Sequence, residues 1–226
     1  MKGRLYVVAT PIGNLKDLTL RAIEILQESD LIIAENRDRA MKLLAHLGLK
    51  KPVVTINTYS EEKKARGIVA RMEKGELCAL ISAAGTPCIS DPGKTIVQRA
   101  YEAGIEVLAA PGPSSVIAAL CISGVPSDKF LFYGFLPLKT GKRRTVLRTL
   151  GGTPYPVVFL ESPRRMENLL QVIRDEWGNR FVVIAKEMTK LYEEVIRGPV
   201  EDLIEGFASE VKGEYTVVVA PEGFEG

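Results

Sequence analysis

Glycine, proline and small hydroxyl residues are concentrated at positions 83–93, in the stretch Ala-Ala-Gly-Thr-Pro-Cys-Ile-Ser-Asp-Pro-Gly. A continuous apolar run at 77–82 precedes this stretch and an amphipathic segment follows it, which predicts a loop between a buried strand and a helix. Backbone groups that glycines leave uncovered can bind a flat, polar ligand such as an adenosine or an amino-acid carboxylate. The alternative is a sharp connection rich in helix breakers, with no ligand.

Three more loops follow predicted strands: 10–14 (Thr-Pro-Ile-Gly-Asn), 35–39 (Glu-Asn-Arg-Asp-Arg) and 111–115 (Pro-Gly-Pro-Ser-Ser). Ligands of parallel α/β domains bind outside the carboxyl ends of the strands, so these loops are the first candidates for a site. Gly93-Lys94-Thr95 resembles the end of a phosphate-binding loop, but the preceding Gly85 lies too far upstream for that motif. No G-x-G-x-x-G pattern follows the first strand, which argues against a dinucleotide-binding domain.

The elements that must position these loops alternate along the chain. Strands are predicted at 5–9, 31–34, 52–56, 77–82 and 106–109, with helices near 17–28, 38–47, 61–74, 93–103 and 114–122. This alternation predicts an α/β fold, and its continuous apolar strands predict a parallel sheet covered on both faces.

Breakers at 123–128 predict a domain boundary, which gives an N-terminal α/β domain at 1–123 with the candidate loops and a C-terminal α/β domain at 124–226. In the second domain, strands are predicted at 130–134, 156–161, 181–186, 194–197 and 215–220, with helices near 142–150, 164–177 and 200–210. The short connection between its last strands predicts a mixed sheet.

Composition restricts the possible partners. The formal net charge of 226 residues is only +2, so any nucleic acid must be bound by a local patch. We expect no metal site, because the chain has one histidine, His46, and its three cysteines lack metal-ligand spacing and are predicted to be reduced core residues. No leader and no apolar run of about 20 residues is visible, which predicts a cytoplasmic protein with no membrane contact.

A local basic patch is present between Lys129 and Arg148, where no acidic residue occurs. Lys142, Arg143 and Arg144 are its centre, aromatic residues precede it, and Arg164 and Arg165 extend it. Aromatic and basic side chains together can stack on bases and neutralise phosphates. The alternative is a core strand followed by a solvated helix face.

Several motifs together resemble a known family. They are Leu-Tyr-Val-Val-Ala-Thr-Pro-Ile-Gly-Asn-Leu at 5–15, Ala-Gly-Thr-Pro-x-Ile-Ser-Asp-Pro-Gly at 84–93, Pro-Gly-Pro-Ser at 111–114, Phe-Tyr-Gly-Phe-Leu-Pro at 132–137, Glu-Met-Thr-Lys at 187–190 and Gly-Glu-Tyr-Thr-Val-Val at 213–218. The chain is similar over nearly its whole length to the ribosomal RNA small subunit methyltransferase I family, part of the tetrapyrrole methylase superfamily. The resemblance implies a two-domain tetrapyrrole methylase-like fold, S-adenosyl-L-methionine in the cleft between the domains, a homodimer, and methylation of a cytidine 2′-hydroxyl in 16S ribosomal RNA.

Carried over by motif, the resemblance implies contacts to S-adenosyl-L-methionine from Pro11, Gly85, Thr86, Pro87, Ile89, Ser90, Ser114, Ser115, Phe135, Leu136, Met188 and Tyr215. Each apolar member of this set is equally compatible with an ordinary core position. The chain departs from the family pattern at Glu35-Asn36-Arg37-Asp38, at Ala83 and at 57–62, where positions expected to face the substrate are altered. Binding of the methyl donor is therefore a safer prediction than the identity of the acceptor.

A ribose hydroxyl is a poor nucleophile, so a nearby carboxylate or lysine is expected to take its proton. Glu35, Glu187 and Lys190 are the catalytic candidates, and surface or ion-pairing roles are the alternative. The candidates for substrate contact are Asn14, Arg37, Lys142, Arg143 and Arg144. Two other functions stay open: methylation of a tetrapyrrole or other small molecule, and binding of donor or RNA without turnover.

Overall fold

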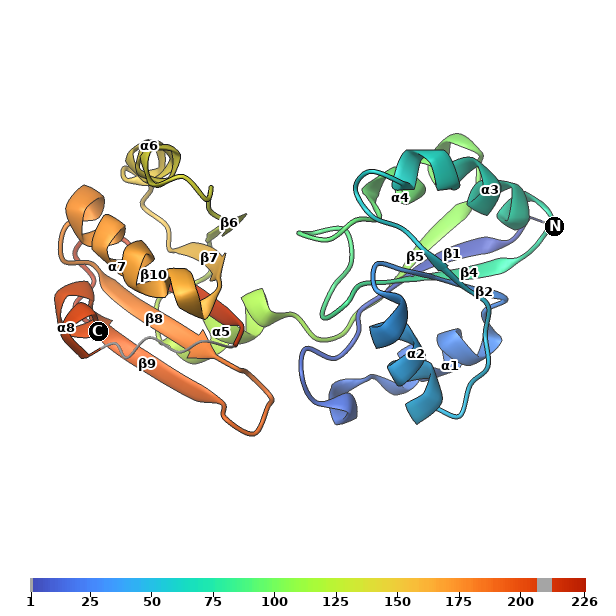
Figure 1. The fold of residues 1–226 in the computed structure, drawn as a ribbon, viewed down its shortest axis with the longest axis horizontal. Coiled ribbons are helices and arrows are strands. Elements are labelled where there is room, and N and C mark those ends of the chain that lie inside the picture. Colours follow the sequence, from blue (N-terminus) through green and yellow to red (C-terminus); the bar gives the residue numbers. More distant parts are fainter. Residues whose placement is uncertain (1, 207–212) are drawn as a thin grey trace. The chain divides into compact units, whose positions relative to one another are not determined.

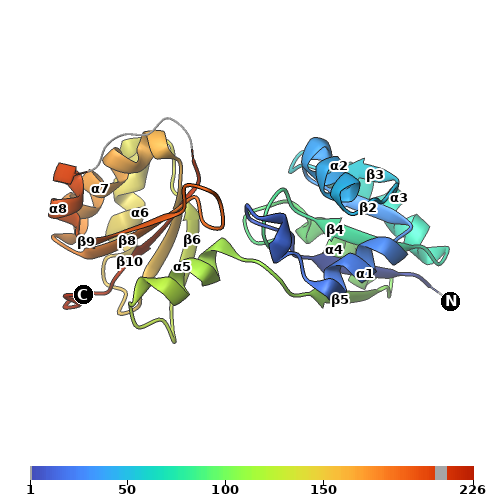
Figure 2. The same ribbon diagram turned by 90° about the horizontal axis from the view of Figure 1, so that it is seen from below.

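The computed structural model describes residues 2–206 and 213–226. It divides into two compact units, Met1–Ser114 and Ser115–Gly226 (Figures 1 and 2). The division lies nine residues before the predicted boundary at 123/124, because helix α5 (Ser115–Ser123) packs on strands of the second unit rather than on the first.

The first unit contains a five-stranded sheet in the order β3-β2-β4-β1-β5, and all its strands are parallel. The strands are β1 (Arg4–Val8), β2 (Leu31–Ala34), β3 (Val53–Thr55), β4 (Leu77–Ile81) and β5 (Glu106–Ala110). Between them lie a 3₁₀ turn, η1 (Leu15–Asp17), and helices α1 (Leu20–Glu28), α2 (Arg37–His46), α3 (Glu61–Glu73) and α4 (Lys94–Glu102). The prediction of a parallel sheet built from strand–helix repeats is confirmed.

Helices cover both faces of this sheet: α3 and α4 lie on one side, α1 and α2 on the other (Figure 1). Successive residues of a strand point to opposite faces. Accordingly Leu31 and Ile33 of β2 pack with α3 and α4, whereas Ile32 packs with α1 and α2. Burial on both faces explains why these strands are continuous apolar runs instead of alternating ones.

The second unit contains a mixed sheet, which confirms the prediction, and its strand order is β6-β7-β10-β8-β9. Its strands are β6 (Leu131–Phe135), β7 (Val157–Glu161), β8 (Phe181–Lys186), β9 (Glu194–Pro199) and β10 (Tyr215–Val219). Its other helices are α6 (Thr140–Leu150), α7 (Pro163–Trp177) and α8 (Val200–Gly206). The last residues of the helix predicted at 200–210 lie outside the described residues.

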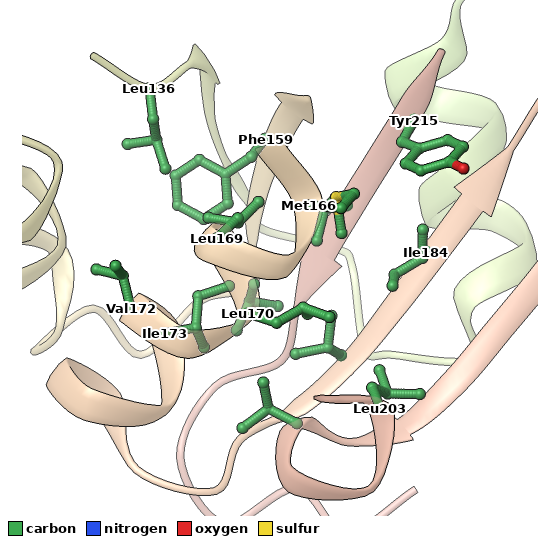
Figure 3. Packing of buried hydrophobic residues seen from close by; sticks show 14 of the residues in the cluster. Leu136, Phe159, Met166, Leu169, Leu170, Val172, Ile173, Ile184, Leu203 and Tyr215 are labelled. Carbon is green, nitrogen blue, oxygen red and sulfur yellow. The ribbon is translucent and has the colours of Figure 1, made fainter. Parts of the chain in front are cut away.

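Helices α6, α7 and α8 cover one face of the second sheet and α5 covers the other (Figure 2). The core on the first face is formed by α7 residues such as Leu169 and Leu170, which pack with Phe159 and Ile184 of the sheet (Figure 3). Each of these side chains is completely buried, and burial of one such side chain stabilises a fold by roughly 1.5–3 kcal/mol.

The prediction that all three cysteines are core residues is wrong for Cys121. Cys78 is buried and Cys88 is half-buried, but Cys121 is exposed. Helix α5 buries Ala119, Leu120 and Ser123, which leaves the side of the helix that carries Cys121 open. Within the described parts of the chain, no helix combines the length and the apolar character needed to cross a membrane.

Candidate functional site

The parallel sheet of the first unit places the loops that follow β1, β2, β4 and β5 at one edge. The loops after β1 and β4 are joined by an isolated antiparallel bridge between Thr10 and Gly85. The Thr10 N–H donates to the Gly85 carbonyl at 2.9 Å and the Gly85 N–H donates to the Thr10 carbonyl at 3.0 Å. Residues 75 positions apart are thereby held together at the strand ends.

Side-chain hydrogen bonds connect the neighbouring loops to this bridge. The Thr86 hydroxyl donates to the Pro113 carbonyl at 3.2 Å, which joins the loop after β4 to the loop after β5. The Arg39 guanidinium donates to the Ala83 carbonyl at 3.4 Å, which joins the first turn of α2 to the same loop. The loops that the sequence selected therefore form one connected edge.

Gly85 is buried in this edge and its φ is +79°, in the left-handed region that glycine adopts without strain. A Cβ atom here would lie 3.3 Å from Cγ2 of Ile12 and 3.7 Å from the Pro113 carbonyl oxygen. The space beside Gly85 is thus filled by the protein itself. The glycine is required by the way the loops meet, before any ligand is considered.

The other sequence-selected residues of this unit differ in exposure. Thr86, Ile89 and Ser90 are exposed, Pro11, Ser114 and Ser115 are half-buried, and Pro87 is buried. The edge therefore offers hydroxyl groups, backbone groups and apolar side chains, of which Ile89 is 61% exposed. Neutral donors and acceptors of this kind suit a ligand that carries hydroxyl, amino-acid and aromatic-base groups.

The N-terminus of α4, which carries the Gly93-Lys94-Thr95 sequence, is closed by a carboxylate of the protein. Glu61 is 4% exposed, and its Oε1 accepts hydrogen bonds from the Thr95 N–H at 2.7 Å and the Ile96 N–H at 3.0 Å. Since these N–H groups are already bound, the start of α4 is not an open phosphate site.

A pair of carboxylates lies at the same edge: Glu35, after β2, and Asp91, in the loop after β4. Burial and, to a smaller extent, the Glu35 carboxylate raise the pKa of Asp91 to about 6, against the opposing effects of Ser82 and Arg39. The sequence interpretation selected Glu35 and missed Asp91. The available signal was that Asp91 is the one acidic residue between positions 83 and 93.

This shift predicts how Asp91 affects stability. The folded state holds the proton more tightly than the unfolded state, whose pKa is near the ordinary value of 3.8. Stability contributed by the protonated carboxyl is therefore present in full at low pH and is lost as the pH rises from about 4 to 6. We expect the unfolding free energy of Asp91→Asn, relative to the native sequence, to rise by about 1–3 kcal/mol between pH 4 and pH 7.5. Urea unfolding at both pH values measures the difference in unfolding free energy between the variant and the native protein. The same difference at pH 4 and pH 7.5 would contradict a raised pKa of Asp91.

The second unit also gathers its sequence-selected residues at one edge. Strand β10 is antiparallel to both β7 and β8, and β6 is parallel to β7, so β6, β7 and β8 end at the edge where β10 begins. In this register Tyr215 pairs with Glu161 on one side and Lys186 on the other. Phe135 and Met188, which lie at the ends of β6 and β8, are thus placed at the edge that carries Tyr215.

The side chains at this edge are not equally available. Phe135 is 60% exposed, whereas Met188 is 7% exposed. Leu136 and Tyr215 are each 3% exposed and belong to the core cluster of the unit (Figure 3). For the side chains of Leu136 and Tyr215, the structure therefore supports the core alternative.

The turn after β8 is held by an ion-pair cluster. Lys190 Nζ lies 3.0 Å from Glu187 Oε1 and 2.9 Å from Glu214 Oε2, and Glu187 Oε1 also accepts the Glu214 N–H at 2.7 Å. Burial alone would lower the pKa of Lys190, but the two carboxylates outweigh it and raise that pKa. A protonated Lys190 cannot accept a proton, so the ion-pairing alternative is supported for this residue.

Backbone strain coincides with these loops. Within residues 2–206 and 213–226, the residues other than glycine with positive φ are Cys88 at 69°, Glu187 at 47° and Thr189 at 66°. All three lie in the loops after β4 and β8 that the sequence selected. Strained backbone of this kind is concentrated at ligand-binding and active sites, where the surrounding structure compensates its cost.

The residues at the centre of the predicted basic patch differ in their exposure and in their ion pairs. Arg143 is 1% exposed, and its guanidinium lies 3.4 Å from Glu161 and donates to Asn168 at 2.8 Å. The expectation that Arg143 is a surface contact is therefore not met, because its charge is used inside the unit. Arg144 is paired with Asp175 at 2.6 Å and with Glu176 at 2.7 Å, whereas Lys142 is exposed.

The remaining polar candidates have local structural roles. The Asn14 side chain accepts the Lys16 N–H at 3.1 Å and caps η1, and the Arg37 guanidinium donates to the Val53 carbonyl at 3.1 Å. Asn36, one of the departures from the family pattern, caps α2 by accepting the Arg39 N–H at 3.0 Å. All three residues are exposed, so a second contact to a substrate is sterically open.

Comparison with known sequences shows clear similarity. Residues 4–204 match the family model described as Tetrapyrrole (Corrin/Porphyrin) Methylases. The chain is 43% identical to Ribosomal RNA small subunit methyltransferase I of Thermotoga maritima over 96% of this chain and 98% of that protein. It is 40% identical to the protein of the same name from Escherichia coli O157:H7, over 96% of this chain and 78% of that protein.

Solved structures share the fold at low sequence identity. The methyltransferase CobJ matches with a TM-score of 0.71 at 16% identity, over 97% of this chain and 95% of that chain. Uroporphyrin-III C-methyltransferase of Thermus thermophilus, solved in complex with S-adenosylhomocysteine, matches with a TM-score of 0.65 at 18% identity. That match covers 96% of this chain and 97% of the Thermus chain.

Proposed function

The chain belongs to the tetrapyrrole methylase family and, within it, to the ribosomal RNA small subunit methyltransferase I proteins, and on that premise we propose its activity. It is an S-adenosylmethionine-dependent methyltransferase that acts in the cytoplasm, as a homodimer, on a cytidine 2′-hydroxyl of 16S ribosomal RNA. The name of the relatives supports the RNA acceptor, and the resemblance of the motifs supports the nucleotide and the hydroxyl.

The observation that carries the proposal is the connected edge of the first unit, where the Thr10–Gly85 bridge and the Thr86–Pro113 hydrogen bond join three loops. Hydroxyl groups of Thr86 and Ser90 and open backbone are the groups needed to hold S-adenosylmethionine there. When bound, that cofactor supplies a methyl group activated on a sulfonium. In the second unit, Phe135 and the turn at 187–190 are the groups proposed to contact it.

The remaining chemical task of the chain is to orient the ribose hydroxyl and remove its proton. We assign this task to the carboxylates of Glu35 and Asp91. An Asp91 carboxyl with a pKa of about 6 is ionised at neutral pH and can accept a proton. Glu187 and Lys190 instead neutralise each other, and their role is to hold the turn after β8.

We expect Asp91→Asn to lower kcat about 100-fold, at the low end of the usual range for general bases, because attack on a sulfonium does not need a strong base. The affinity for S-adenosylmethionine is expected to stay within about twofold, since asparagine keeps the shape of the side chain and the proposed contacts to the donor come from other residues. Steady-state kinetics and calorimetry measure the two quantities. An unchanged kcat in Asp91→Asn would exclude Asp91 as the base.

Glu35→Gln should shift the acid limb of the pH profile of kcat to lower pH, because one cause of the raised pKa of Asp91 is removed.

The proposed function is tested by incubating the protein with radiolabelled S-adenosylmethionine and small ribosomal subunits that lack the modification. Nuclease digestion and mass spectrometry should then identify 2′-O-methylcytidine as the labelled product. Label on a base, or no label at enzyme excess, would reject the proposal.

The description of the matching family model favours a tetrapyrrole as the second candidate acceptor. An RNA acceptor predicts affinity that falls steeply as salt rises, whereas a tetrapyrrole in an apolar site predicts little salt dependence. Binding titrations between 50 and 300 mM salt, on the order of the range over which phosphate contacts are lost, distinguish the two.

A further inference from the structure

Helices α6 and α7 run parallel and begin at the same edge of the second sheet. At their starts, the Arg165 guanidinium donates to the Leu136 carbonyl at 2.8 Å. At their ends, the Trp177 indole N–H donates to the Leu147 carbonyl at 2.6 Å. Both helices therefore begin beside the ends of β6 and β7, at the edge that carries Phe135 and Met188.

The cations of α6 and α7 differ in whether they form ion pairs. Near the end of α7, Glu176 lies 2.7 Å from Arg144 and 2.6 Å from Arg148 of α6. Asp175 lies 2.6 Å from Arg144 and 2.9 Å from Arg174 of α7. At the starting end, three cations are exposed and form no ion pair with any residue in the described ranges: Lys139, Lys142 and Arg164. The charge that is open to a partner is thus concentrated where the helices begin.

A buried cluster supports this end of the unit. Glu161 is 2% exposed and lies 3.4 Å from Arg143 and 3.1 Å from Arg165, so two guanidiniums share one carboxylate. These arginines also donate to the Pro137 carbonyl, at 3.4 Å and 3.5 Å. The cluster is therefore positively charged and holds the segment from which Lys139 extends.

The acidic residues at the starting end of the two helices leave its net charge positive. Glu167 lies on α7 and is exposed, while Glu187 and Glu214 are bridged by Lys190. The cations at this end outnumber these carboxylates together with Glu161. The N-terminal turns of two helices add partial positive charge in the same place, which favours phosphate.

We propose that the starting turns of α6 and α7, with Lys139, Lys142 and Arg164, bind the sugar–phosphate backbone of the RNA next to the nucleotide that is methylated. The inference rests on the proposed function and deepens it, because it names the surface that holds the acceptor. The surface lies at the same edge of the unit as Phe135, which is proposed to contact the methyl donor, so RNA backbone bound there runs along the edge that carries this contact. Arg144, which the sequence interpretation included, is outside this surface.

The test compares two triple variants. Lys139→Gln/Lys142→Gln/Arg164→Gln removes the open cations. The control, Arg144→Gln/Arg148→Gln/Arg174→Gln, removes the same number of charges from cations of the same helices that are paired with Asp175 and Glu176. We expect the first variant to raise KM for the ribosomal RNA by about tenfold or more and to reduce the slope of log Kd against log salt by about 2 to 3. Its affinity for S-adenosylmethionine and its kcat at saturating RNA should not change. The control should change KM by less than about threefold, as for charges that are already neutralised.

Equal effects of the two variants would show that only net charge matters and would overturn the assignment, as would an unchanged KM in the first variant. Direct binding to a small-subunit RNA fragment without methyl donor separates this inference from the proposed function. If the native protein transfers no methyl group but binds the fragment, a selective loss in the first variant still supports the surface, and equal binding by both variants still rejects it.

Discussion

Replacing Gly85 with valine abolishes binding of S-adenosylmethionine and also destabilises the first unit. Gly85 has φ +79°, a conformation that is strained for a β-branched residue by roughly 1–3 kcal/mol. The new side chain must also displace Ile12, whose Cγ2 would lie 3.3 Å from the added Cβ. Both effects disrupt the Thr10–Gly85 bridge, so the loops that hold the cofactor no longer meet. Isothermal calorimetry and thermal unfolding measure the two losses.

A matched control separates backbone strain from the loss of the site. Gly48 also has a positive φ, +68°, but a Cβ added there would have no neighbour within 4 Å. We expect Gly48→Val to lose stability by a similar strain cost, about 1–2 kcal/mol, while it keeps its affinity for the cofactor. If Gly85→Val bound S-adenosylmethionine with native affinity, the loop after β4 would have to be removed from the site.

Replacing Glu161 with glutamine costs about 3–5 kcal/mol of folding free energy, because it leaves buried guanidinium charge without its carboxylate. Arg143 is 1% exposed and cannot turn to solvent without leaving the core. Urea unfolding of the native and variant proteins measures the loss. Adding Arg143→Met to Glu161→Gln should recover part of it, since the uncompensated buried charge is then removed.

The control for this prediction is Glu222→Gln in the same unit. Glu222 lies 3.2 Å from Arg180, but its side chain is 89% exposed, so this pair is expected to contribute no more than about 1 kcal/mol. A loss for Glu161→Gln no larger than the loss for Glu222→Gln would show that the buried cluster is not essential to the unit.

Much of the secondary structure follows from local patterns. Strand β2 was predicted at 31–34 and β8 at 181–186, and both have these bounds in the structure. Apolar runs with breakers at their ends are local signals, and a parallel sheet buried on both faces gives its strands the strongest of them. The loops at 83–93 and 111–115 were found in the same way, because glycine and proline act on the backbone of their own segment.

Charge patterns along the chain were a poorer guide than apolar ones. The stretch from Lys129 to Arg148 has no acidic residue, and it predicted a basic surface that included Arg143 and Arg144. Asp175 and Glu176, some thirty positions later, neutralise Arg144 because α6 and α7 are parallel neighbours. The raised pKa of Asp91 likewise depends on its burial and on Glu35, which follows a neighbouring strand of the sheet.

The amino-acid sequence by itself determined which segments are strands, helices and glycine-rich loops, since these depend on residues that are close along the chain. Tertiary structure alone decided which charges are open to a partner, which carboxyl group has a raised pKa, and that α5 belongs with the second unit. The physical reason is that burial and ion pairing depend on neighbours in space, and the packing of whole elements is what brings those neighbours together.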